Sequence, residues 1–159
     1  MLKIKNYSEL KPKYKGYKSF LSEYNPFIDY YDFLLLAIKR GKILTVKRII
    51  ETKNSHLKFQ GRQFDILEHA IIHNQVKIVK YLLKLHNEDK FFLFLEKDDN
   101  YLLIRAYERH HNTIVGLLFK QEKVYNHLIK RQHGFYKQVC EVIQELDRIK
   151  SLNNKLKDF

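Results

Sequence analysis

The sequence predicts an all-α fold made of three repeated helix pairs followed by one further long helix. The first observation is a pattern of apolar residues that recurs three times and superimposes when it is aligned on one alanine. The three copies are Leu34, Ala37, Val46, Ile49 and Ile50; Leu67, Ala70, Val79, Leu82 and Leu83; Leu103, Ala106, Val115, Leu118 and Phe119. The alanines are 33 and 36 residues apart, a period typical of stacked helical arrays. The second observation is the scarcity of glycine and proline, five and two in 159 residues, which argues against a turn-rich all-β chain.

Residues 1–27 precede the repeats as a basic leader. Over residues 1–18 six lysines stand against the single acid Glu9, which leaves a net charge of +5, and Glu23 lowers the charge of the whole leader to +4: Lys3, Lys5, Lys11, Lys13, Lys15 and Lys18. Tyrosines alternate with these lysines, and Pro12 and Gly16 interrupt any long helix. Lysines neutralise phosphates and tyrosines stack on unpaired bases, so the leader is the strongest nucleic-acid feature of the chain. The alternative interpretation is an arm whose aromatic side chains cover the first repeat.

The repeat array spans residues 28–120, and the apolar pattern of each repeat predicts a short first helix, a turn and a second helix. The first helices are expected over residues 32–40, 65–73 and 101–109, with Asp32 and Asp65 placed to cap the first two. The turns contain Gly41, Asn74 and His110, and glycine and asparagine tolerate the positive φ that often follows a helix. The second helices carry apolar residues at i, i+3 and i+6 or i+7, the stripe of an amphipathic helix.

Two long connections, residues 51–63 and 86–100, join the repeats. The second contains the apolar run 91–95, which we expect to pack under the array or to cover it.

The region after the repeats, residues 121–159, is expected to cap the array, because a terminal repeat must hide one apolar face. Residues 135–155 predict one long amphipathic helix, with apolar residues at spacings of three and four: Phe135, Val139, Val142, Leu146, Ile149 and Leu156. The same spacing also fits a short coiled coil with Asn153 in a core position. We favour a capping helix in a monomer and keep an oligomer through this helix as the alternative.

The repeated pattern resembles the ankyrin repeat. The second copy carries the family's leucine, alanine, turn, valine and paired-leucine positions as Leu67, Ala70, Asn74, Val79 and Leu82-Leu83. The threonine-proline-leucine-histidine tetrad of the family and most of its hairpin glycines are missing. The resemblance implies an ankyrin-like helical repeat solenoid of about three repeats, with an N-terminal extension and a C-terminal capping helix. It also implies a non-enzymatic module that binds another protein through the concave face of the array.

Carried over residue by residue, the resemblance also implies the partner-binding positions. They are the exposed ends of the first helices and the tips of the connections: Tyr31, Lys39, Arg40, Arg62, Phe64, His73, Lys97, Glu108 and Arg109. This set is basic and contains aromatic side chains, as contact surfaces often do. We therefore expect a protein partner with an acidic surface.

Catalytic and metal-binding patterns are weak in this sequence. His69 and His73 are four residues apart on one expected helix and can share a metal, but no third ligand is evident, so we interpret them as polar helix residues. Residues 98–100, Asp-Asp-Asn, resemble a fragment of a calcium loop without its glycine and glutamate. Cys140 has apolar neighbours, which indicates a buried and inert thiol. No phosphate-binding or nucleophile motif occurs, so we expect no enzyme activity, no metal and no cofactor.

The bulk composition narrows the partner classes and the compartment. The net charge of +12 admits nucleic acid, an anionic membrane or an acidic protein, although lysines spread along the chain also suit solvated helix faces. No apolar run reaches the roughly 18 residues of a membrane span. One cysteine favours a reducing, cytoplasmic compartment. Small ankyrin-like proteins with this lysine, isoleucine and asparagine bias resemble secreted effectors or host-interaction proteins of intracellular bacteria and large viruses, which would act in the host cytosol.

Overall fold

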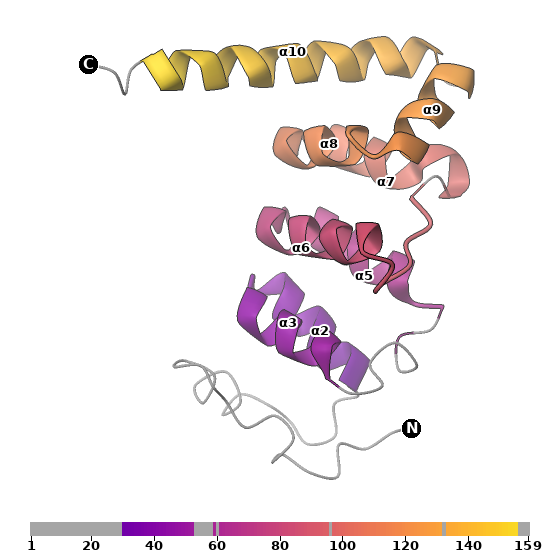
Figure 1. Cartoon of the computed structure of the whole chain (residues 1–159), viewed down its shortest axis with the longest axis vertical. Coiled ribbons are helices and arrows are strands. Elements are labelled where there is room, and N and C mark those ends of the chain that lie inside the picture. Colours follow the sequence, from indigo (N-terminus) through magenta and orange to yellow (C-terminus); the bar gives the residue numbers. More distant parts are fainter. Residues whose placement is uncertain (1–29, 53–58, 60, 96, 132, 156–159) are drawn as a thin grey trace. The chain divides into compact units, whose positions relative to one another are not determined.

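The computed structural model describes residues 30–52, 59, 61–95, 97–131 and 133–155, and every regular element in these ranges is a helix (Figure 1). The helices are α2 (Tyr30–Lys39), α3 (Ile43–Glu51), α5 (Gln63–Ile72), α6 (Val76–Asn87), α7 (Lys97–Glu108), α8 (Asn112–Phe119), α9 (Glu122–Arg131) and α10 (His133–Lys155). The predicted all-α class is therefore confirmed for this part of the chain. The leader, residues 1–27, lies outside the described residues.

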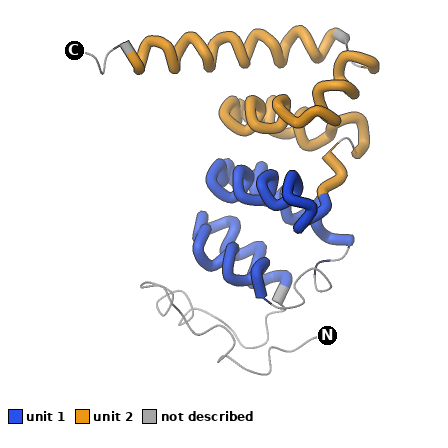
Figure 2. The backbone as a smooth tube through the Cα atoms, in the orientation of Figure 1, with its two compact units in different colours: residues 1–92 blue, residues 93–159 orange. Residues whose placement is uncertain are grey.

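The chain divides into two compact units, residues 1–92 and 93–159, coloured blue and orange in Figure 2. In the first unit α2 pairs with α3 and α5 with α6, and the pairs meet through α2 against α5 and α3 against α6. In the second unit α7, α8 and α9 pack on one another, and α10 packs on α8 and α9. The division falls inside the connection that the sequence places at residues 86–100.

Three helix pairs, α2–α3, α5–α6 and α7–α8, are joined by the same turn. At each one, the residue after the turn donates its backbone N–H to the carbonyl of the anchor alanine: Lys42 to Ala37, Gln75 to Ala70 and His111 to Ala106, at 2.9, 2.9 and 3.0 Å. The residue before it has positive φ, 65° at Gly41, 52° at Asn74 and 55° at His110. This is the Schellman arrangement that satisfies the free carbonyls at a helix end. The repeat seen in the sequence is thus a repeat in backbone geometry.

The anchor alanines lie in the cores of their units, where Ala37, Ala70 and Ala106 have no exposed surface. All but one of the apolar partners that the pattern predicts are buried as well, the exception being the half-buried Phe119: Leu34, Val46, Ile49, Ile50, Leu67, Val79, Leu82, Leu83, Leu103, Val115 and Leu118. A small side chain at each anchor lets the two helices of a pair approach closely, and burial of the stripe provides the main stabilisation.

The ends of several helices differ from the sequence-based expectation. The helices α2 and α5 start earlier than expected, so Asp32 and Asp65 lie inside the first turns, and the residue that precedes α5 makes no side-chain capping bond. A carboxylate in a first turn still favours the helix through the helix dipole. Asp98, Asp99 and Asn100, at the start of α7, have φ of 50°, 56° and 63°, a left-handed turn that asparagine and aspartate tolerate better than most residues.

The apolar run 91–95 alternates between buried and exposed side chains instead of being covered throughout. Phe91, Leu93 and Leu95 are buried, whereas Phe92 and Phe94 are 52% and 55% exposed. Successive side chains of this connection therefore face alternately into the core and toward solvent. The expected long C-terminal helix is confirmed by α10, while the separate helix α9 precedes it.

Candidate functional site: a basic and aromatic face on α2 and α5

Six of the nine candidate residues lie on the first helices and adjoining turns of the first unit: Tyr31, Lys39, Arg40, Arg62, Phe64 and His73. We call the surface formed by α2, α5 and the residues next to them the first-helix face. Lys39, Arg40 and Arg62 are exposed, and Tyr31, Phe64 and His73 are half-buried. Because α2 packs against α5, these residues belong to one surface within one compact unit.

An aromatic contact joins the two helices at the start of this face. The guanidinium of Arg62 lies over the ring of Tyr31, 4.5 Å from its centroid, a favourable cation–π distance. Burial, the charge of Asp65 and a hydrogen bond to Asp65 raise the pKa of Tyr31, so its hydroxyl remains a donor at neutral pH. The sequence placed Tyr31 and Arg62 in one site, and the structure brings them into contact. Sequence analysis did not assign Asp65 to this site, where its negative charge offsets part of the positive charge of Arg62.

A cluster of nitrogen-bearing side chains occupies the other end of the face, near the turns. The rings of His69 and His73 are 4.5 Å apart between centroids, one turn from each other on α5. Burial, the neighbouring His73 and the charge of Lys39 on α2 lower the pKa of His69, which also makes a hydrogen bond with the backbone of Leu35. The neutral imidazole is therefore the favoured form of His69. Sequence analysis treated His69 as an ordinary polar residue and missed its contacts with α2.

The turn of the second helix pair holds the end of α2 in place beside this cluster. The side-chain amide of Gln75 donates a hydrogen bond to the carbonyl of Lys39, with 3.2 Å between the heavy atoms. A last-turn carbonyl that α2 cannot satisfy internally thereby gains a partner. The bond fixes the backbone from which the Lys39 and Arg40 side chains project.

The three other candidate residues, Lys97, Glu108 and Arg109, lie on α7 or directly after it, in the second unit. Lys97 is 4.0 Å from Asp98 and Glu108 is 3.9 Å from Arg105, distances at which exposed ion pairs contribute little. Arg109 is exposed. These three residues belong to a different compact unit from the first-helix face, so they form a second candidate set.

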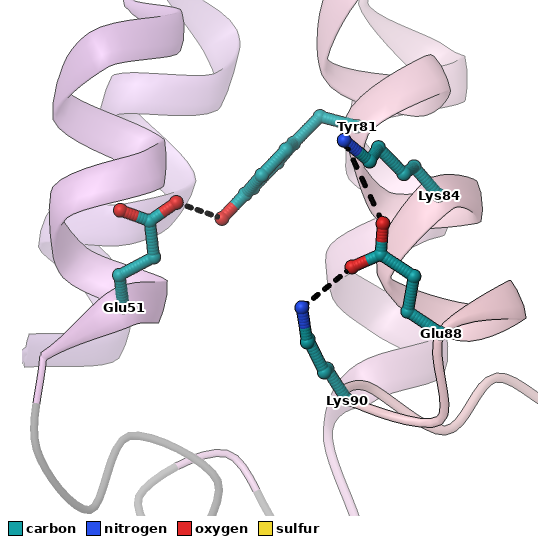
Figure 3. A network of polar contacts seen from close by, with 5 residues as sticks. All are labelled: Glu51, Tyr81, Lys84, Glu88 and Lys90. Carbon is teal, nitrogen blue, oxygen red and sulfur yellow. Dashed lines mark hydrogen bonds and ion pairs between the residues drawn. The ribbon is translucent and has the colours of Figure 1, made fainter.

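The second helices of the first unit carry a polar network of a different kind (Figure 3). The Tyr81 hydroxyl on α6 donates to a Glu51 oxygen on α3 at 3.0 Å, and Lys47 lies over the Tyr81 ring at 5.3 Å. Burial and Glu51 raise the pKa of Tyr81 above its ordinary value. Glu88 binds Lys90 at 2.7 Å and Lys84 at 3.6 Å, and Lys90 holds the pKa of Glu88 below its ordinary value. Both acids of this network are bonded within the unit, whereas the turn end of the first-helix face has two exposed cations, Lys39 and Arg40, with the carboxylate of Glu68 close to His69.

Possible metal ligands and the thiol of Cys140 are the remaining reactive groups that the sequence singled out. Across the described ranges, no three His, Cys, Asp or Glu side chains gather closely enough to hold a metal ion. Cys140 is half-buried rather than buried, and its thiol and the Tyr125 hydroxyl form hydrogen bonds with Tyr136 that raise the pKa of that tyrosine to about 12.

Membrane-spanning character and similarity to known proteins bear on the class of protein. None of the helices in the described ranges has both the length and the apolar character needed to cross a membrane. Comparison with family models, curated proteins and solved structures finds no match to this chain.

Proposed function

We propose that this chain is a non-enzymatic protein-interaction module, an ankyrin-like array of helix pairs that binds an acidic surface of a partner protein. The observation that carries the proposal is the turn end of the first-helix face, where Lys39 and Arg40 are two consecutive exposed cations and Lys39 lies close enough to His69 to lower its pKa. The Schellman turns shared by three helix pairs support the ankyrin-like interpretation, since they make each pair one copy of the same unit.

The chemistry of the face suits a carboxylate-rich partner. Arg40 offers a planar set of donors that can bind a carboxylate through two hydrogen bonds, and Lys39 adds a second exposed cation. Tyr31, with Arg62 over its ring, offers a rigid half-buried aromatic group of the kind that dominates binding energy in interfaces. In an ankyrin-like array Glu108 and Arg109 take the places that Lys39 and Arg40 have in the first pair, since both follow the anchor alanine by two and three residues.

The test is partner capture from a nuclease-treated lysate with charge reversals. Arg40→Glu changes the first unit, Arg109→Glu changes the second, and both are combined in a double variant. The matched control is Lys80→Glu, which makes the same charge change on the exposed side of α6. We expect the double variant to lose the partner while Lys80→Glu retains it, with all variants melting like the unchanged chain. Retention of the partner by the double variant would overturn the assignment of this face.

The alternative function is nucleic-acid binding through the leader, supported by its six lysines, its interleaved tyrosines and the chain's net charge of +12. Deletion of residues 1–18 should then abolish binding to single-stranded RNA or DNA, and binding by the full chain should weaken steeply with salt. Captured material that disappears with nuclease and with this deletion would favour this alternative over the protein-interaction module. For either function, the single cysteine is consistent with action in a reducing compartment such as the cytoplasm, or the host cytosol for a secreted effector.

A further inference from the structure

The helix α10 is much longer than α8, one of the two helices on which it packs. Its 23 residues extend over about 34 Å, whereas the eight residues of α8 extend over about 12 Å. The contact between them is close at Gly116, where a Cβ atom would lie 3.4 Å from Leu146 and 3.5 Å from Ile143. Within the second unit, the C-terminal end of α10 therefore extends past the end of α8, as Figure 1 shows.

The C-terminal half of α10 carries apolar side chains that are largely exposed. Ile149 is 45% exposed and Leu152 is 52% exposed, while Val142 and Leu146, earlier on the helix, are half-buried. Residues 142, 146, 149 and 153 follow spacings of four, three and four, which places them along one seam of the helix. Along this seam the side chains change from half-buried, at Val142 and Leu146, to exposed, at Ile149.

The polar residues around the seam indicate what covers it. In the heptad that this spacing defines, Leu146 and Asn153 take position a, Val142 and Ile149 take d, Glu145 takes g and Lys150 takes e. When two such helices lie parallel, position g of one helix meets the e position five residues further along the other. Glu145 would thus meet Lys150 of a second copy, and by symmetry the same pair would form twice. An asparagine at position a favours a two-stranded pairing in one register, because it can bond to its equivalent.

We infer that the seam Val142–Asn153 binds a second copy of this chain, so that two α10 helices pair in parallel. The exposed ion pairs within the helix, Lys150 to Asp147 at 2.9 Å and Arg148 to Glu145 at 3.8 Å, are worth little and do not compete strongly. The helix is already formed on α8, so pairing does not have to meet the cost of helix nucleation. The seam is short, and the dimer is accordingly weak and depends on concentration.

The first experiment measures the mass of the full chain by sedimentation equilibrium from micromolar to millimolar concentration. We expect a monomer that passes to a dimer as concentration rises. Ile149→Asp with Leu152→Asp should keep the chain monomeric without lowering its melting temperature, since both side chains are exposed. The matched control is Gln144→Asp with Ser151→Asp, two exposed positions on the opposite side of the helix, which should leave the dimer intact. A chain that stays monomeric throughout, or a dimer that survives the Ile149 and Leu152 changes, would overturn the inference.

The second experiment tests the pairing of Glu145 with Lys150. Glu145→Lys alone and Lys150→Glu alone should each weaken the dimer, because like charges then face each other. The double exchange should restore it, and an equal mixture of the two single variants should form a mixed dimer. Single variants that dimerise as well as the unchanged chain, or a mixture that does not associate, would overturn the parallel pairing. Neither experiment depends on the proposed partner-binding face.

Discussion

Gln75 connects the two helix pairs of the first unit, because its side-chain amide donates to the Lys39 carbonyl at 3.2 Å while its backbone N–H donates to the Ala70 carbonyl at 2.9 Å. The Gln75 side chain also limits what can replace Gly41. A Cβ atom on Gly41 would lie 2.7 Å from the Gln75 side-chain oxygen, and the backbone there has a φ of 65°. One glutamine thus joins the turn of the second pair to the turn of the first.

Gly41→Ala should destabilise the first unit by about 1–2 kcal/mol, the typical cost of a left-handed conformation for a residue with a Cβ atom. The contact with Gln75 adds to this cost unless the glutamine side chain moves and gives up its bond to Lys39. Chemical denaturation measures the free energy of unfolding. Gly134→Ala is the control, because nothing lies within 4 Å of a Cβ atom at that position, and it should not be destabilising. Equal stability of Gly41→Ala and the unchanged chain would contradict the role given to this turn.

Val79→Asp should strongly destabilise the first unit and lower its melting temperature. Val79 has no exposed surface, so an aspartate there would be a buried charge without a partner, at a cost of about 3–5 kcal/mol against a total stability of about 5–15 kcal/mol. Lys80→Asp places the same side chain on the neighbouring exposed position and should cost less than about 1 kcal/mol. Thermal melting followed by circular dichroism separates the two. A cooperative melt of Val79→Asp near that of the unchanged chain would show that Val79 is not a core residue.

The helix pairs could be predicted from the sequence because their signals are local and repeat. Three copies in register give the buried positions of Ala37, Ala70 and Ala106, and glycine and asparagine mark two of the turns. The third turn has His110 at positive φ, which histidine alone would not indicate; the register of the other copies places it. The third turn could therefore be placed by aligning the three copies, although the conformational preference of histidine alone does not predict it.

The features that sequence reasoning missed depend on packing between segments. Burial and the neighbouring His73 lower the pKa of His69; Lys39, which belongs to another helix, lowers it further, whereas the hydrogen bond with the Leu35 backbone of that helix raises it. The exposure of Phe92 and Phe94 depends on how the connection packs on the helices, which an uninterrupted apolar run does not reveal. The candidate face was predicted from a resemblance, and only the packing of α2 against α5 shows that Tyr31 and Arg62 are in contact.

Gly116 allows a graded test of the contact between α8 and α10. Gly116→Ala should be tolerated or stabilising by up to about 1 kcal/mol, because alanine favours a helix and its Cβ atom would make ordinary contacts with Leu146 and Ile143. Gly116→Leu should instead be destabilising by about 1–3 kcal/mol, because the larger side chain must displace both neighbours. Urea denaturation of the two variants measures the difference. Similar stability of Gly116→Ala and Gly116→Leu would show that α10 does not pack closely here.

The stability of the first unit should fall as the pH drops below 6.5, the ordinary pKa of histidine, because His69 has a lower pKa in the folded chain. The unfolded chain then takes up the proton before the folded chain does, so the loss begins near pH 6.5 and continues until the pH passes the folded pKa. His69→Gln removes the titrating group and keeps an amide that can bond to Leu35. The difference in unfolding free energy between the two chains, measured by urea denaturation across this window, isolates His69 from the carboxylates. His73→Gln should raise the His69 pKa, because one of the charges that lower it is removed, and NMR titration of His69 would measure the change. Parallel pH profiles for the unchanged chain and His69→Gln would contradict the packing of His69 beside Lys39.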